Sequence, residues 1–152
     1  DLADAKKVIY NEDIEAIVSD SSTTTEDRFE LLELTITSGN ATAPKATVSL
    51  AVDGDGKSTV ASGVGPVDAI FKAIAELTET SSDLIRYQVH AVTAGLDAQG
   101  EVTVTIEEEG RRVIGNGVHE DVMVASGKAY VNAINKLEWH RRRHEVDEPR
   151  GI

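Results

Sequence analysis

The chain has 152 residues, of which 40% are hydrophobic and 28% charged, the balance of one ordinary globular domain with short tails. Its net charge of −12 and its aromatic content of 4% disfavour a nucleic-acid-binding module, which needs basic surface and stacking side chains. The absence of cysteine excludes disulfides and thiolate chemistry and favours a reducing, cytoplasmic compartment, and no stretch approaches a membrane span or resembles a signal peptide.

The first segment, residues 1–25, is predicted to be a helical linker. Apolar residues recur at helical spacing between Val8 and Val18, and the polar run Ser21–Thr25 separates this helix from the rest of the chain. Because the chain begins with Asp1 rather than Met, we expect it to be a fragment of a longer protein.

Three strands are predicted next. Apolar and polar residues alternate over Leu32–Thr37, with Leu32 on the buried face, and again over Ala46–Val52. The residues Asp53–Gly56 tolerate positive φ and predict a hairpin into a third strand over Ser58–Ser62. The alternation indicates a sheet with one face against a core.

A helix is predicted after the third strand. The glycines of Gly63-Val64-Gly65 end the strand run, and Pro66 suits the first helical position, where its missing N–H costs nothing. Four apolar residues then recur at helical spacing and form a stripe for the core: Val67, Ile70, Ile74 and Leu77.

The same order of elements is predicted a second time. Strands are expected over Ile85–Ala91, Val102–Ile106 and Arg112–Asn116, with a turn at Gly110 before the last of them. In the first of these, Ile85, Tyr87 and Val89 alternate with polar residues and are expected on the buried face. A helix with one apolar face is expected from about Glu120 to Leu137.

The two halves also match residue by residue. The helical segment Ala69–Leu77 corresponds to Ala129–Leu137, with Ala, Ala, Ile and Leu identical. Further matches at one constant offset are Gly39 with Gly95, Val48 with Val104, and Gly54 with Gly110. The pattern therefore predicts an α+β fold of two βββα repeats related by a pseudo-twofold axis, with antiparallel sheets packed against helices. One such unit has too little core to stand alone, and exposed sheet edges favour a homodimer.

No catalytic or metal-binding constellation is evident. His140 and His144 have the helical spacing of a metal pair, but the cations Arg141–Arg143 between them disfavour a metal, and we interpret this run as a solvated helix end. The turn Asp53–Gly56 lacks the downstream Glu of a calcium loop, and Glu107–Glu109 are expected to lie in solvent. We therefore predict no catalytic residue and no metal ligand in this chain.

The informative feature is a pair of glycine-rich junctions between a strand and a helix, at Gly63–Ala69 and at Gly115–Asp121. Glycine lets a ligand approach the backbone, and a helix N-terminus offers free N–H groups and a partial positive charge to a carboxylate. With apolar residues just beyond, such a junction suits a branched-chain amino acid, whose ammonium Asp68 or Asp121 could accept. The alternative is that these glycines only make tight turns and close helix packing.

The candidate ligand-binding residues are taken from these junctions. In the first unit they are Gly63, Gly65, Val67, Asp68, Ile70 and Ile74, with Leu84 at the start of the next strand closing the groove. In the second unit they are Gly117, Asp121 and Val124.

Several segments together resemble the regulatory domain of 2-isopropylmalate synthases. The resemblance covers roughly residues 12–137 in the right order, and the segments that carry it are Ser38-Gly39, Pro44–Val48, Gly63–Ala69 with Lys72–Ile74, Tyr87–Gly95, Asp97–Val102 and Ala125–Asn135. The sequence departs from the family at Val64, where Asp is frequent between the two glycines, and in the charged tail after Leu137.

The resemblance implies a division of labour between this chain and a missing part. The parent enzyme condenses acetyl-CoA with a 2-oxo acid on a separate TIM barrel that uses a divalent metal, and the barrel's His-x-His motif is missing here. We therefore expect no cofactor and no synthase activity in this fragment. Its implied role is to dimerise and to bind leucine, the end product, at the candidate residues above.

The resemblance leaves two alternatives open. Citramalate synthases are similar and respond to isoleucine, and a few methyl groups in a pocket would decide between the two ligands. A relative without feedback would keep the domain only as a structural dimer. By domain, we expect a linker from the catalytic part in residues 1–25, the regulatory and dimerisation domain in 26–138, and a charged tail in 139–152.

Overall fold

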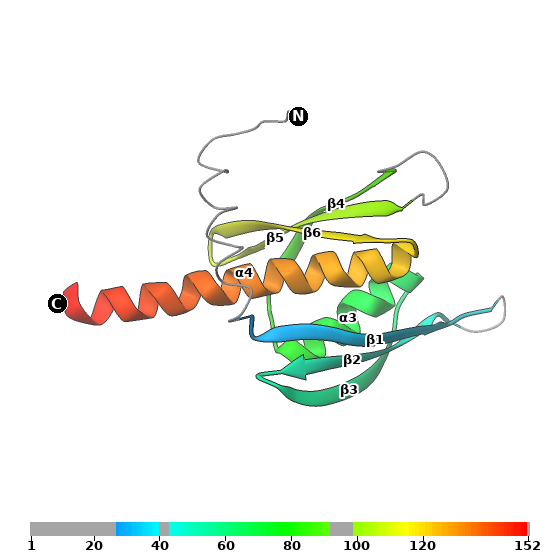
Figure 1. Ribbon diagram of the computed structural model, residues 1–152, viewed down its shortest axis with the longest axis horizontal. Helices are drawn as coiled ribbons and strands as arrows, with labels where there is room; N and C mark the ends of the chain where they lie inside the picture. Colours follow the sequence, from blue (N-terminus) through cyan, green and yellow to red (C-terminus); the bar gives the residue numbers. More distant parts are fainter. Residues whose placement is uncertain (1–26, 40–42, 92–98, 152) are drawn as a thin grey trace.

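The computed structural model describes residues 27–39, 43–91 and 99–151, so the predicted linker helix in residues 1–25 lies outside the described part (Figure 1). The elements, in chain order, are β1 (Phe29–Thr37), β2 (Lys45–Val52), β3 (Asp55–Ser62), α3 (Pro66–Thr78), β4 (Asp83–Ala91), β5 (Gly100–Glu108), β6 (Arg111–His119) and α4 (Val122–Gly151). They form two antiparallel three-stranded sheets, of order β1-β2-β3 and β4-β5-β6. The predicted repeat of two βββα units is confirmed.

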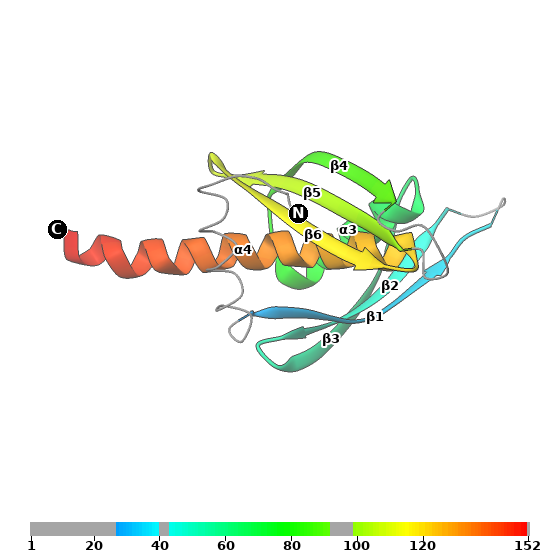
Figure 2. The same cartoon turned by 45° about the horizontal axis from the view of Figure 1, so that its top comes forward.

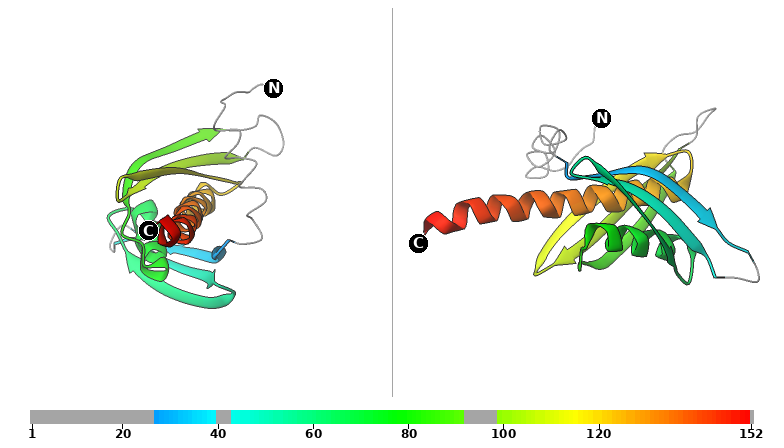
Figure 3. Two further views of the ribbon diagram at one scale, coloured as in Figure 1. Left: turned by 90° about the vertical axis from the view of Figure 1, so that its left-hand side faces the viewer. Right: turned by 90° about the horizontal axis from the view of Figure 1, so that it is seen from below.

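The two helices lie between the two sheets, as Figures 1 and 2 show. Figure 3, left, gives the same arrangement end-on, with one sheet above the helices and the other below. α3 packs on β2 and β3 of its own unit, whereas α4 packs on β5 and β6 and also reaches β1 of the other unit. Each sheet thus buries one face against the helices and leaves its other face to solvent.

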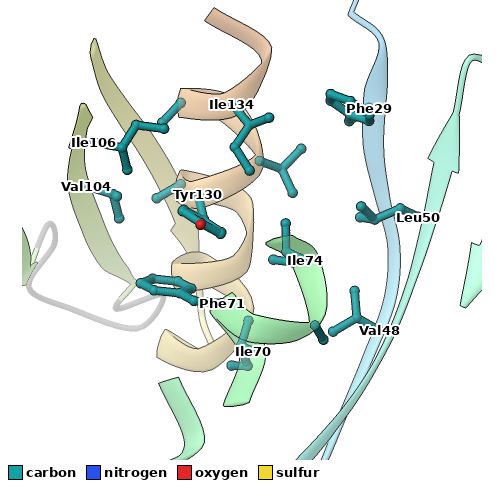
Figure 4. Close-up of a cluster of buried hydrophobic side chains, with 14 of the residues drawn as sticks. Phe29, Val48, Leu50, Ile70, Phe71, Ile74, Val104, Ile106, Tyr130 and Ile134 are labelled. Atoms are coloured by element: carbon teal, nitrogen blue, oxygen red, sulfur yellow. The ribbon is translucent and has the colours of Figure 1, made fainter. Parts of the chain in front are cut away.

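The core between the sheets is built from equivalent residues of the two units (Figure 4). Val48 and Leu50 of β2 and their counterparts Val104 and Ile106 of β5 are fully buried. Ile70 of α3 lies between these strands and is also fully buried. Each such side chain contributes about 1.5–3 kcal/mol by leaving water, and the two units share one core.

The first helix begins and ends as the sequence predicts. Pro66 occupies the first turn of α3, and the helix ends at Glu79, whose φ of 56° takes the left-handed conformation that stops a helix. Its predicted apolar stripe is confirmed, since Ile70 and Ile74 are buried and Val67 is half-buried against the core.

The two hairpins use the same turn geometry. Asp53 and Gly54 have positive φ values of 53° and 89°, and the corresponding Glu109 and Gly110 have 53° and 81°. Two consecutive residues with positive φ are typical of the tight turns that match the twist of antiparallel strands. The predicted hairpin at residues 53–56 is therefore confirmed, and the turn recurs at the equivalent place in the second unit.

The predicted faces of the two outer strands were wrong at one position each. A register shift lies between Leu31 and Glu33 in β1, and another between Leu84 and Arg86 in β4. At these β-bulges the extra residue breaks the alternation, so that Leu32 and Ile85 are exposed rather than buried. The bulge at the same place in both units is a further mark of the repeat.

Two boundaries near the C-terminus also differ from the prediction. β6 continues to His119, so Gly115 and Gly117 lie inside a strand rather than at a junction between strand and helix. α4 continues through the predicted tail to Gly151, and Figure 1 shows its last turns extending beyond the sheets. No helix among the described residues combines the length and the hydrophobicity needed to cross a bilayer.

Candidate functional site

The first glycine-rich junction, between β3 and α3, is a close-packed turn. A Cβ atom added to Gly63 would lie 2.5 Å from Asp68 Oδ2 and 2.6 Å from the backbone nitrogen of Ala69. The Val64 N–H donates a hydrogen bond to Asp68 Oδ2 at 3.1 Å, and Lys72 Nζ lies 3.2 Å from the same oxygen. Asp68 therefore already holds the turn and pairs with Lys72, and a ligand ammonium would share it with both.

The N-terminus of α3 has no side-chain cap. Gly65 occupies the N-cap position in an extended conformation, Pro66 brings no N–H, and the first backbone bond of the helix joins Ala69 N–H to Gly65 O at 3.0 Å. A Cβ atom at Gly65 would meet nothing within 4 Å, so the space in front of this helix end is open. An uncapped N-terminus of this kind presents N–H groups and partial positive charge to an anion.

The apolar candidates of α3 differ in what they can touch. Val67 in the first turn is half-buried, whereas Ile70 and Ile74 are fully buried in the core. Only Val67 therefore offers surface to a ligand in this conformation, and the two isoleucines fix the position of the helix beneath it.

The structure adds an apolar surface that the helices leave uncovered, the inner face of β4. Leu84, Tyr87 and Val89 pair with the buried residues of β5 and so lie on the core side of the sheet. Nevertheless Leu84 is 49% exposed and Val89 48%. Apolar side chains that face a core and remain half in solvent mark a place where a ligand or a partner can bind.

The equivalent face of β1 in the first unit is covered. A Cβ atom built on Gly127 of α4 would lie 3.3 Å from both Leu31 and Leu34 of β1, so α4 approaches this strand directly. By the matching bulges and the helix alignment, the equivalents of these three residues are Val67, Leu84 and Tyr87. The pseudo-twofold symmetry is therefore broken at β4, and this is what leaves its inner face accessible.

Aromatic rings and hydroxyl groups line the inner end of this surface. The Phe71 ring lies between Tyr87, at a centroid distance of 5.9 Å, and Tyr130, stacked at 4.4 Å. The hydroxyls of Tyr87 and Ser126 are 2.7 Å apart, and Ser126 Oγ donates to Val122 O at 2.8 Å. Burial raises the pKa of the Tyr130 hydroxyl, and its hydrogen bond with Ser82 only partly offsets this.

Sequence reasoning missed Tyr87, Val89 and Ser126 as candidates. The alternation of residues 85–91 places Tyr87 and Val89 on the core face, where they do lie, but the sequence carries no sign that the helices leave Val89 half exposed. Ser126 gave a weak signal, a polar residue within the apolar face of a predicted helix, and it is fully buried.

The candidates of the second unit serve the packing and capping of α4. A Cβ atom on Gly117 would lie 2.2 Å from Ala125 O and 2.6 Å from Ala129 N, so this glycine lets β6 touch the helix backbone. Asp121 Oδ1 accepts a hydrogen bond from the Met123 N–H at 2.8 Å and so caps α4. Val124 is half-buried beside them. Since α4 is capped and α3 is not, the two helix ends are not equivalent as anion sites.

The described part of the chain contains no cluster of side chains suited to bind a metal ion. Among residues 27–39, 43–91 and 99–151, no group of three or more His, Asp or Glu side chains is arranged to hold a metal ion.

Comparison with known proteins gives one family. Residues 8–138 match the LeuA allosteric (dimerisation) domain. The 2-isopropylmalate synthase of Syntrophus aciditrophicus (strain SB) is 49% identical over 142 residues, which are 93% of this chain and 28% of that protein. The 2-isopropylmalate synthase of Thiobacillus denitrificans is 46% identical over 144 residues, 94% of this chain and 28% of that protein. The chain thus spans little more than a quarter of these curated relatives, and it belongs to the LeuA allosteric (dimerisation) domain family.

Proposed function

We propose that this chain is the leucine-responsive, dimeric feedback-regulatory part of a 2-isopropylmalate synthase and has no catalytic role of its own. The condensation of acetyl-CoA with a 2-oxo acid would belong to a separate metal-dependent part of the parent protein. Support comes from the family match over residues 8–138 and from relatives that carry this name.

The observation that carries the ligand assignment is the combination of an uncapped α3 N-terminus with an uncovered apolar face on β4. An amino acid needs both features, because its carboxylate requires hydrogen-bond donors and its aliphatic side chain requires apolar surface. We infer that the carboxylate binds at Gly63 and Gly65, before the first turn of α3, with the ammonium at Asp68. The side chain would lie against Val67 and Leu84.

The remaining candidates have supporting roles in this proposal. Ile70 and Ile74 would hold α3 in place from the core side, and Gly117, Asp121 and Val124 would fix the start of α4 against β6. A ligand that binds one arrangement of the helices better than another shifts the equilibrium between them, and that shift is the regulatory signal.

A continuous set of contacts leads from this surface to the start of β1, where the preceding segment enters the domain. Tyr87 of β4 bonds Ser126 of α4, and α4 in turn bonds Phe29 of β1 through the side chain of Asn135. We infer that the regulatory signal passes along α4, since it packs on β5 and β6 of one sheet and on β1 of the other.

Isothermal titration calorimetry of this chain with leucine, isoleucine and valine tests the proposal. Saturable binding selective for leucine is expected. Selective binding of isoleucine would instead indicate the regulatory part of a citramalate synthase, and binding of none of the three would contradict the effector site and leave a structural dimer domain.

A substitution at Gly65 tests whether leucine binds in front of α3. Gly65→Phe fills the open space in front of α3 and is expected to abolish leucine binding without unfolding the domain, since no atom lies within 4 Å of the added Cβ and φ is −149°. Gly56→Phe is the matched control, because Gly56 lies in the β2–β3 hairpin region and is equally open. Normal leucine binding by Gly65→Phe would place the site elsewhere.

A further inference from the structure

We propose that β4 is the strand through which two copies of this chain pair, edge to edge and antiparallel, about a twofold axis at Gln88. The inference rests on the dimer in the proposed function and adds the surface that makes it. The occupant is a second copy because an antiparallel pair of identical strands is self-complementary, and because the family is described as a dimerisation domain.

The outer edges of β6 and β1 are already occupied by side chains of α4. At β6, Asn132 Oδ1 accepts a hydrogen bond from the Asn116 N–H at 2.9 Å, and Lys136 Nζ donates to Ile114 O at 2.7 Å. At β1, the amide of Asn135 bonds both backbone groups of Phe29. An incoming strand would have to displace these bonds, which disfavours pairing along β6 and at the start of β1.

The edge of β3 carries a lysine side chain that disfavours pairing with another strand. Lys57 pairs with Leu50, a core residue, so its side chain lies on the inner face of the sheet at the open edge, and it is exposed there. An inward-facing lysine on an edge strand disfavours pairing, because a second strand would bury its charge.

The inner face of the β4 edge is apolar instead of charged. Its edge residues Leu84 and Val89 are half exposed there. Outward backbone groups beside exposed apolar side chains are the two features that strand addition satisfies together.

The ladder shows which backbone groups of β4 point outward. The Asn116 N–H faces α4, so the backbone of Asn116 does not bond the backbone of its partner Thr103, and the Thr103 backbone groups must then face β4. There Thr103 pairs with Gln88. Since backbone direction alternates along a strand, the residues on either side, Tyr87 and Val89, direct their N–H and C=O groups away from the sheet.

These outward groups limit the registers open to the pair, and we place the axis at Gln88. With the axis at Gln88, Tyr87 of one copy bonds Val89 of the other, and the reverse, which gives four backbone hydrogen bonds. An axis at Tyr87 would instead need Ile85, which lies in the β-bulge. The proposed register also places each Val89 side chain beside Tyr87 of the second copy and removes it from solvent.

The test introduces single cysteines. Because the parent chain has no cysteine, any disulfide-linked dimer must form through the introduced residue. In the proposed pair the two Gln88 residues face each other as a non-hydrogen-bonded pair, with Cα atoms about 4.5 Å apart, within disulfide range. Gln88→Cys is therefore expected to form a disulfide-linked dimer on mild oxidation. The control His90→Cys is exposed on the same strand, but its two copies would be about 13 Å apart and stay unlinked. Val60→Cys, exposed on β3, is also expected to stay unlinked.

Sedimentation equilibrium of the unmodified chain tests whether the chain is a dimer, separately from whether the dimer pairs through β4. A dimer whose Gln88→Cys variant fails to cross-link, or whose Val60→Cys variant links instead, overturns the β4 pairing and leaves the dimer intact. If a segment of the same chain covers the edge of β4, Gln88→Cys is likewise expected not to cross-link, and the β4 pairing is overturned in that case too. A monomer overturns both, while leucine binding is judged separately by calorimetry.

Discussion

The side-chain amide of Asn135 in α4 bonds both backbone polar groups of Phe29 in β1. The Phe29 N–H donates to Asn135 Oδ1 at 2.9 Å, and Asn135 Nδ2 donates to Phe29 O at 2.8 Å. The two residues are 106 positions apart, and Asn135 is 7% exposed. The amide thus takes the place of a neighbouring strand residue and fixes the first described strand to the last helix.

Asn135→Ala should destabilise the domain by about 2–4 kcal/mol, because it leaves a buried N–H and a buried C=O without partners. Denaturant unfolding measures the change. The control is Asn132→Ala, which removes a similar bond to a strand N–H at an exposed site and should cost about 0.5–1 kcal/mol, since water replaces the lost acceptor. Equal losses for the two variants would contradict the role given to Asn135.

Gly117→Ala should destabilise by about 3 kcal/mol. The added Cβ would lie 2.2 Å from Ala125 O, a helix backbone atom that can move only with the helix, so β6 and α4 must separate. Thermal or urea unfolding measures the effect. Gly65→Ala is the matched control, because its Cβ enters open space, and its stability should stay within about 0.5 kcal/mol of the parent chain. A stable Gly117→Ala would mean that the close contact is not needed.

Most of the fold could be predicted from the sequence, because alternation and helical spacing report how residues face a core. The repeat, the hairpin at Asp53–Gly56 and the start of α3 at Pro66 were predicted and are confirmed. Leu32 was placed wrongly because a bulge inserts a residue and leaves no mark in the hydrophobic pattern. Gly117 was placed at a junction because a glycine that opens space for a helix looks in sequence like one that makes a turn.

The candidate site was predictable only in part. The open end of α3 at Gly65 could be read from Pro66 and the two glycines, since these set local backbone conformation. The uncovered face of β4 could not, because it depends on where α3 and α4 end relative to a strand of the other unit. Contacts between units, such as the bond from Tyr87 to Ser126, have no local signature.

Glu138→Gln should destabilise by about 2 kcal/mol. Glu138 lies between Arg28, whose Nη1 is 3.3 Å away, and Arg141, and its side chain is 12% exposed. Partial burial lowers the pKa of Arg28, but Asp53 and Glu138 raise it overall, so the guanidinium stays charged beside them. Losing the shared carboxylate leaves Arg28 with Asp53 and Arg141 with Glu108, and removes the mostly buried negative charge that holds the two guanidinium groups together. Urea unfolding at low and high salt measures the loss.

The control for this network is Glu107→Gln. Glu107 pairs with Arg112 at 3.2 Å, but the side chains are 33% and 63% exposed, so the pair is screened and its loss should cost less than about 1 kcal/mol. A larger loss at Glu107 than at Glu138 would contradict the ranking by burial.

Tyr130 should make the domain sensitive to alkaline pH. Burial raises the pKa of its hydroxyl above the ordinary value of 10.0, with a smaller opposing effect from the hydrogen bond with Ser82. The folded state then holds this proton more tightly than the unfolded state. The resulting stability is fully present below about pH 10 and is lost as the pH rises through the folded-state pKa. Tyr130→Phe keeps the stack on Phe71 and has no proton to lose. Urea unfolding at pH 8 and above pH 10 should therefore show a smaller decline for Tyr130→Phe than for the parent chain, and parallel declines would mean that Tyr130 ionises equally in both states.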